Sequence, residues 1–465
     1  MTDPHDDLDA WLEAQVRPLP PPPGTFELIR KRARRRKITR AAGAAAGAVA
    51  VITLIAAVPT LIIPRLQVGT GPASDSVATG QTLPISSSHP SATTSAPAPT
   101  VGLPPVPANF AATSVTFIGT FTGWVIGQAG TPGHCFTKDC TSVARTDDGG
   151  ATWYGVPAPV TGAPDGSTGV SQIRFLDRDN GWAFGPQLYA THDGGQHWAR
   201  ISTGGTRVTA LEARGNRAFA VWARCTGTGS DFAAHCTSFA VHSAAMGSDQ
   251  WTPVGGASAT VGPGGTAGSA SLLLTGTLGY LLTPSGAVLG GPISGQGTWQ
   301  PLVAASTASA ANSASPSGTS PCSSGAAQPD GQPAGGLLAA TSSAGLVLLC
   351  TGQATAGTQS KTVYTSSDSG AKWQLAGTAP AAGTATSVAG TPSGAIIIAT
   401  TQGIEVSTDG GAIWAAAQGS LPAGGLAFVG MTTMSQGVAV PADPSQDAVW
   451  FTMDGGQTWQ ESAIK

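Results

Sequence analysis

Aspartates recur within a repeated motif of this chain, and their carboxylates are the main candidates for chemistry. Five copies of one sequence motif place an Asp two residues after a Ser or Thr, a Gly two residues later and a Trp three residues after that. The Asp and Trp residues of the five copies are Asp148 and Trp153, Asp193 and Trp198, Asp368 and Trp373, Asp409 and Trp414, and Asp454 and Trp459. Such carboxylates could act as general acids and bases, or they could bind a metal ion.

The residues around these carboxylates argue against both kinds of chemistry. A calcium loop needs further oxygen ligands, which the stretch 147–150 lacks, and the histidines are scattered along the chain. Glycoside hydrolysis needs two carboxylates that face each other across a cleft. Asp177 and Asp179 are close in sequence, but residues 177–181 are typical of a polar turn, while Asp231 lies in a loop and Glu405 in a strand. We therefore expect no catalytic residue, no metal and no cofactor.

The repeat indicates the elements that position these residues. Each unit also holds a β-rich stretch around a small-then-apolar step, such as Gly123-Trp124, and a Trp ends each unit even where the Asp is lost, at Trp251 and Trp299. Both landmarks occur seven times. Units of roughly 45 residues with four short strands are typical of β-propeller blades. In the second unit we expect strands at 171–176, 181–185, 187–191 and 197–202.

The fold class that follows is all-β, a seven-bladed β-propeller of four-stranded blades. The 64 glycines and the low charged fraction of 10% suit short strands and tight turns better than long surface helices. Each repeated Asp should accept hydrogen bonds from the amides of a hairpin turn. Each repeated Trp should pack into the gap between neighbouring blades.

The N-terminal part of the chain has a different composition. Residues 41–63 carry no charge and are long enough to cross roughly 30 Å of hydrocarbon as a helix. The basic cluster at residues 30–37 places the N-terminus in the cytoplasm, which favours membrane topology over nucleic-acid binding. We predict a cytoplasmic tail at 1–37, a transmembrane signal anchor at 38–64, a disordered Ser-, Thr-, Pro- and Ala-rich linker at 65–107, and an extracytoplasmic propeller at 108–465. A cleaved signal peptide is the alternative for the apolar segment. Residues 3–16 form either a disordered tail or an amphipathic docking peptide for a cytoplasmic partner.

The cysteines all follow the predicted anchor. Their even number suits disulfides in an oxidising compartment. They occur in the first, third and fifth units, where the interval between the two landmarks is longest. We predict three bonds within blades, Cys135–Cys140, Cys225–Cys236 and Cys322–Cys350, each stapling an extended hairpin on the face opposite the repeated turns. These hairpins are either binding loops or tolerated surface insertions.

The eight-residue motif resembles the Asp-box, or bacterial neuraminidase, repeat, Ser/Thr-x-Asp-x-Gly-x-x-Trp. The resemblance covers residues 109–463 and extends to sialidases, sortilin-type receptors, xyloglucan hydrolases and the photosystem II assembly and stability factor family. It implies a box in the turn between the third and fourth strands of a blade, opposite the active-site face. It also implies that the five repeated Asp residues are structural.

The chain departs from the sialidases of that superfamily at their catalytic residues. A sialidase clamps its substrate carboxylate with three arginines, because a planar fork suits that group. The last arginine here is Arg224, no Arg-Ile-Pro motif occurs, and only Glu212, Glu405 and Glu461 remain as glutamates after the anchor. An enzyme is therefore not expected.

Together these features predict a non-catalytic, membrane-anchored propeller that serves as a binding or assembly scaffold for an extracytoplasmic protein or glycan. The Ala-, Gly- and Pro-rich composition is typical of an actinobacterial cell envelope protein. Two other functions stay open, a glycan-binding or sialidase-like glycosidase and an envelope sensor that signals through its cytoplasmic tail. No nucleic-acid partner is expected.

Overall fold

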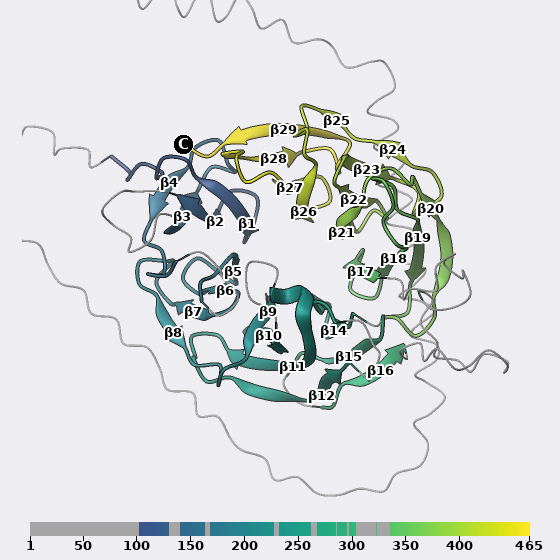
Figure 1. Ribbon diagram of the computed structural model, residues 1–465, viewed down its shortest axis with the longest axis horizontal. Helices are drawn as coiled ribbons and strands as arrows, with labels where there is room; N and C mark the ends of the chain where they lie inside the picture. The colour runs from purple at the N-terminus through teal and green to yellow at the C-terminus, as the bar shows by residue number, and fades with distance from the viewer. Residues whose placement is uncertain are drawn as a thin grey trace, which may run out of the picture. The chain divides into compact units, whose positions relative to one another are not determined.

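Hairpins between strands that follow each other in sequence build this protein. The computed structural model describes residues 102–129, 140–162, 168–226, 232–261, 267–284, 286–294, 297–303, 322 and 335–465. These residues form seven sheets, six antiparallel with four strands and one with five. The sheets, here called blades 1 to 7 in chain order, are arranged around a common centre (Figure 1).

Within each blade the strands are hydrogen-bonded in sequence order, with the first strand innermost. Blade 1 contains β1 (Ala111–Phe117), β2 (Gly123–Ala129), β3 (Cys140–Thr146) and β4 (Tyr154–Val156); blade 2 contains β5 (Gln172–Phe175), β6 (Gly181–Phe184), β7 (Leu188–Thr191) and β8 (Ala199–Ile201). Blade 3 contains β9 (Arg207–Arg214), β10 (Arg217–Cys225), the 3-10 helix η1 (Phe232–His235), β11 (Cys236–Ala245) and β12 (Thr252–Thr260); blade 4 contains β13 (Ser271–Thr275), β14 (Leu278–Leu282), β15 (Val288–Pro292) and β16 (Gln300–Val303). Blade 5 contains β17 (Gly335–Ala340), β18 (Leu346–Thr351), β19 (Lys361–Ser366) and β20 (Gln374–Ala379). Blade 6 contains β21 (Ala385–Gly390), β22 (Ile396–Thr400), β23 (Gly403–Ser407) and β24 (Ala415–Ala416). Blade 7 contains β26 (Leu426–Met431), β27 (Gly437–Pro441), β28 (Ala448–Thr452) and β29 (Thr458–Ala463), and β25 (Gln418–Gly419) pairs in parallel with β29 at its outer edge.

The apolar core lies between the blades rather than within them. Each of the seven main clusters of buried residues joins two neighbouring blades. Strands covered by a blade on both sides read as continuous apolar runs, and β18, β22 and β27 are buried at every position. This packing explains why one blade could not fold without its neighbours.

The ring closes without any exchange of strands between its ends. All four strands of blade 1 precede blade 2, and all those of blade 7 follow blade 6. The junction between blades 7 and 1 is held by a shared core and by edge-to-face contact of Phe117 with Phe451, whose ring centroids are 5.5 Å apart. The indole N–H of Trp153 also donates to Ser462 Oγ at 3.2 Å.

The structure confirms the predicted all-β propeller with seven blades of four strands. The second unit has its four strands where they were expected, shorter by a residue or two at several ends. The predicted tail, anchor and almost all of the linker lie outside the described residues. Within the part that is described, no helix is long and apolar enough to cross a membrane.

Candidate functional site

The five copies of the repeated motif form one kind of turn between the third and fourth strands of blades 1, 2, 5, 6 and 7. In blade 1, Thr146 Oγ1 donates to Asp148 Oδ1 at 2.8 Å and accepts the Gly150 N–H at 2.9 Å. Asp148 Oδ1 also accepts the N–H of Thr152 at 2.9 Å. The same three contacts recur in the other four turns. Gly150 has a φ of 91°, which a side chain would strain.

The carboxylates of these turns are already occupied by hydrogen bonds. Slight burial raises the pKa of Asp193, but hydrogen bonds from His197 and Thr191 outweigh it and lower the pKa to about 2. The pKa of Asp148 is also lowered, because hydrogen bonds from Thr152 and Thr146 outweigh a small effect of burial. A carboxyl group with so low a pKa is a poor proton donor near neutral pH. The turns thus hold their hairpins together and offer no acid for catalysis.

Aromatic side chains connect each blade to the next. The Trp residues of the repeat pack at interfaces with the preceding blade, as Trp153 and Trp459 show. A second set of aromatic residues, on the second strands of the blades, contacts the following blade. Trp124 Nε1 of blade 1 donates to Gly194 O in the repeated turn of blade 2, and the Tyr280 hydroxyl of blade 4 donates to Ser369 O in the repeated turn of blade 5. Blade 3 has lost the repeated turn, and the buried indole N–H of Trp182 in blade 2 has no partner.

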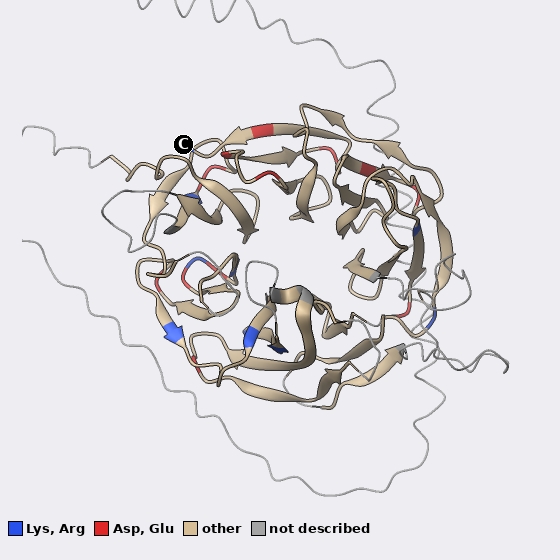
Figure 2. Ribbon diagram, in the orientation of Figure 1, with Lys and Arg blue, Asp and Glu red and all other residues tan. Residues whose placement is uncertain are grey.

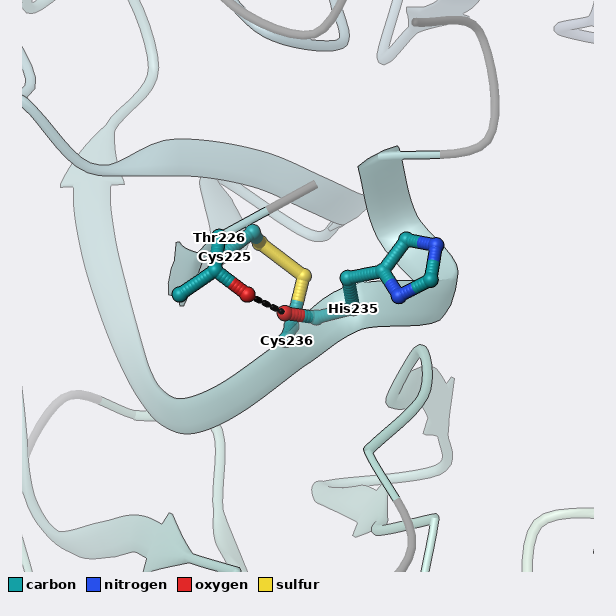
Figure 3. The surroundings of a disulfide bond; sticks show 4 residues. All are labelled: Cys225, Thr226, His235 and Cys236. Atoms are coloured by element: carbon teal, nitrogen blue, oxygen red, sulfur yellow. Dashed lines mark hydrogen bonds between the residues drawn. A yellow bond between two sulfur atoms is a disulfide. The ribbon is translucent and has the colours of Figure 1, made fainter. Parts of the chain in front are cut away.

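Two disulfides lie near the ends of second strands, on the face opposite the repeated turns, and the one in blade 3 closes an extended hairpin. Cys225 ends β10 and bonds to Cys236, which begins β11 directly after η1 (Figure 3). The Thr226 N–H donates to His235 O at 3.1 Å and closes the same hairpin end. In blade 5, Cys350 of β18 bonds to Cys322, which precedes β17, so this predicted bond forms but does not staple the hairpin between β18 and β19 as expected. The third expected pair, Cys135–Cys140, involves side chains outside the described residues.

The innermost strands of all seven blades line a central channel with a cavity of about 480 Å³. Its wall exposes polar and apolar surface in about equal parts, and Arg174 and Glu212 are the only charged side chains among the described residues that line it. Arg174 Nε donates to Glu212 Oε1 at 3.1 Å, and Arg174 Nη1 donates to Ile173 O at 3.0 Å. The guanidinium carbon lies 5.8 Å from the ring centroid of Phe428. The charge in the channel is therefore confined to one ion pair on blades 2 and 3, and the rest of the described wall is uncharged.

A second polar group is buried between blades 5 and 6. Lys361 is fully buried and donates from Nζ to Pro380 O at 2.5 Å and to Ala382 O at 2.8 Å. Glu405 Oε1 lies 3.9 Å from the same nitrogen, and Glu405 Oε2 is buried without a hydrogen-bond partner. Burial raises the pKa of Glu405 to about 7, although the charge of Lys361 acts in the opposite direction. Burial likewise lowers the pKa of Lys361.

The other acidic candidates from the sequence do not converge on a site. Asp177 Oδ1 accepts the N–H groups of Asp179 and Asn180 at 2.9 and 2.7 Å, as a turn carboxylate does. Asp231 lies outside the described residues. In the part of the chain that the structure describes, no group of three His, Cys, Asp or Glu side chains could hold a metal ion. The pairing of Arg174 with Glu212 was not predicted, and its only signal in the sequence was the presence of charged residues on the innermost strands of two successive units.

Comparison with known proteins finds resemblance only at the level of structure. No family model and no curated protein matches the chain. A solved structure of YCF48 bound to D1 peptide matches with 18% identity and a TM-score of 0.39, covering 62% of this chain and 79% of YCF48. YCF48 from Cyanidioschyzon merolae matches with 15% identity and a TM-score of 0.40, covering 63% and 85%. An ancestral GH74 enzyme matches with 12% identity and a TM-score of 0.46, covering 78% of this chain and 47% of the enzyme. The likeness is one of propeller fold.

Proposed function

We propose that this protein is a non-catalytic binding scaffold that holds part of an extracytoplasmic partner in its central channel. The observation that carries the proposal is the composition of the channel wall. A cavity of about 480 Å³ that combines apolar side chains with one ion pair and several hydroxyl groups is of a size and character that suit ligand binding. Arg174 would meet an anionic group, since a guanidinium fork suits a carboxylate, and the apolar side chains of the wall would meet the body of the ligand.

The number of carboxylates in the channel supports binding over glycoside hydrolysis. Glu212 is the one carboxylate among the described lining residues, and it is paired with Arg174. Both mechanisms of glycoside hydrolysis usually need a second carboxyl group within about 10 Å, on the other side of the scissile bond. The Asp residues of the repeated turns lie at the hairpin ends and are held by hydrogen bonds. We take them as Asp-box residues with a structural role.

The proposal includes a membrane anchor at residues 38–64 and an extracytoplasmic propeller. It is supported by the uncharged run at 41–63, the basic cluster before it and the two disulfides, which suit an oxidising compartment. Alkaline phosphatase fused after Lys465 should be active in cells, and the same enzyme fused after Lys37 should be inactive. The reverse pattern would refute this topology.

Site-specific photo-crosslinking tests the channel as a binding site. A benzophenone side chain at Leu273, which lines the cavity, should crosslink a defined partner in the native membrane. The matched control places the same group at Gln374, an exposed position on β20. The Leu273 adduct should fall at least fivefold in Arg174→Gln, because the anion-binding group is lost.

Two results would overturn the proposal. One is crosslinking from Gln374 as strong as from Leu273, with no effect of Arg174→Gln. The other is hydrolysis of aryl glycosides that Glu212→Gln abolishes, which would favour the glycosidase.

A further inference from the structure

Large apolar side chains are exposed on the face that carries the repeated turns. Phe121 is 65% exposed in the turn between β1 and β2, and Met434 is 62% exposed in the turn between β26 and β27. Met453 is 64% exposed within the repeated turn of blade 7. Strand order places these turns at the same end of their blades, because the first and third hairpin turns of an antiparallel sheet lie on one side. We call Phe121, Met434 and Met453 the junction patch.

Two hydrogen bonds join the turns of these three residues where blade 7 meets blade 1. Gln436 Nε2 donates to Thr120 O at 2.8 Å, which joins the turn of Met434 to the turn of Phe121. The Gly455 N–H donates to Ser435 O at 2.9 Å, which joins the turns of Met453 and Met434. The junction patch is therefore one surface formed by both ends of the ring.

Ionised carboxylates border the junction patch. The Gly149 N–H donates to Phe121 O at 2.8 Å, so the turn that contains Asp148 lies against Phe121. Asp454 follows Met453 directly, and hydrogen bonds from Thr458 and Thr452 lower its pKa in spite of slight burial. Asp148 is likewise held ionised.

Basic residues lie on the blade 1 side of this surface and not on the blade 7 side. Arg145 is paired with Asp147 at 2.9 Å, Arg178 Nη2 donates to Thr122 Oγ1 at 3.2 Å beside Phe121, and no Lys or Arg occurs between Lys372 and Lys465. Figure 2 shows the consequence, since the sector from β21 to β29 carries acidic but no basic segments. The junction patch is thus apolar at its centre, and its border carries the carboxylates of Asp148 and Asp454 and is free of basic residues on the blade 7 side.

We propose that the junction patch is the docking site for a basic amphipathic helix of a partner protein. Exposed methionines are flexible and polarizable, and they adapt to the apolar face of a bound helix. The bordering carboxylates would pair with lysines or arginines beside that face and would speed association at low salt. An anionic lipid surface would be repelled by the same carboxylates, so the occupant is a protein segment. This surface is separate from the channel and does not depend on its ligand.

A peptide of defined chemistry tests the docking site on the full-length chain. The probe is an 18-residue Leu/Lys peptide designed as an amphipathic helix. A peptide of the same composition with its leucines spread around the helix, and a Leu/Glu version, are the controls. We expect saturable binding of the amphipathic Leu/Lys peptide alone, weakening at least fivefold between 50 and 300 mM salt.

Substitutions locate the binding on the surface. The triple variant Phe121→Ser, Met434→Gln and Met453→Gln should bind at least tenfold more weakly, and it should fold because all three side chains are exposed. Met246→Gln is the matched control, since Met246 is 44% exposed in the turn between β11 and β12 of blade 3. It should bind within twofold of wild type, and so should Arg174→Gln. The methyl NMR signals of Met434 and Met453 should shift on binding, whereas that of Met246 should not.

Three results would overturn the proposal. The first is unchanged affinity in the triple variant with the methyl signals of Met434 and Met453 unmoved. The second is equal binding of the Leu/Glu peptide. The third is binding to anionic vesicles that the triple variant abolishes while peptide binding persists, which would make the junction patch a lipid contact.

Discussion

A carboxyl group buried between two blades should make the stability of the propeller depend on pH. Glu405 faces the buried ammonium of Lys361 at 3.9 Å, and one of its oxygens has no hydrogen-bond partner. The perturbation is Glu405→Gln, which keeps the shape of the side chain and mimics its protonated form. Its effect should grow as pH rises, because only the ionised form of Glu405 is disfavoured by burial.

The magnitude follows from the pKa of Glu405. Burial raises this pKa to about 7 from the 4.5 of an unperturbed glutamate. Between these values the folded protein holds a proton that the unfolded chain has lost, so stability falls as pH rises. At about 1.4 kcal/mol per pKa unit, the contribution present below pH 4.5 and lost above pH 7 is about 3 kcal/mol. Glu405→Gln should remove this dependence.

Urea unfolding followed by tryptophan fluorescence measures the effect. The free energy of unfolding of Glu405→Gln minus that of wild type should increase by about 2.5 kcal/mol from pH 5 to pH 8, because part of the full change lies below pH 5. Comparing the two proteins cancels the titration of groups that they share. Glu461→Gln, at an exposed position on β29, is the control and should follow wild type within about 0.5 kcal/mol. A constant or decreasing difference between Glu405→Gln and wild type would refute the reasoning.

Three further predictions concern the turns and the bonds between blades, and urea unfolding checks each of them. Trp124→Phe should cost about 1 kcal/mol more than Trp182→Phe, because only the first change breaks a hydrogen bond to the next blade; equal costs would contradict this. Ser369→Gly should stabilise by about 0.5–1 kcal/mol, since Ser369 has a φ of 62°, and a loss of stability would show that its side chain has another role. Thr146→Val should destabilise by about 1–3 kcal/mol and Thr146→Ser by less, because serine keeps the hydroxyl that bonds Gly150 and Asp148.

Much of the fold could be predicted from the sequence because each blade is local. Each blade is built from hairpins of neighbouring strands, and five blades carry the same sequence motif. A Trp marks the end of a blade even where the Asp of the motif is lost. Trp299 shows why a Trp can remain where the repeated turn is lost. It is buried against blade 3 and donates to Pro292 O at 3.3 Å, so its packing does not depend on the Asp of that turn. The repeated turns themselves involve residues no more than four positions apart.

The candidate sites were harder to predict because they depend on contacts between blades. Arg174 and Glu212 are 38 residues apart and meet only when blades 2 and 3 pack around the channel. Glu405 was correctly expected in a strand, but nothing in the sequence placed Lys361 beside it. The junction patch unites residues from both ends of the domain, and its only local signal was an apolar residue in each of three turns. The predicted anchor and the Cys135–Cys140 bond stay predictions.

The closure of the ring without strand exchange has a consequence for synthesis of the chain. Blade 1 packs its apolar side on blade 7, and roughly 270 residues separate Val156 from Leu426. At roughly 5–20 residues per second, the ribosome needs on the order of 15–60 s to deliver the missing partner. During that interval Val125 and Trp153 lack the blade 7 residues that bury them in the folded protein, while the middle blades can already pack on each other. The first blade to emerge is therefore the last to be completed, and it is the part of the nascent domain with the greatest need for a chaperone.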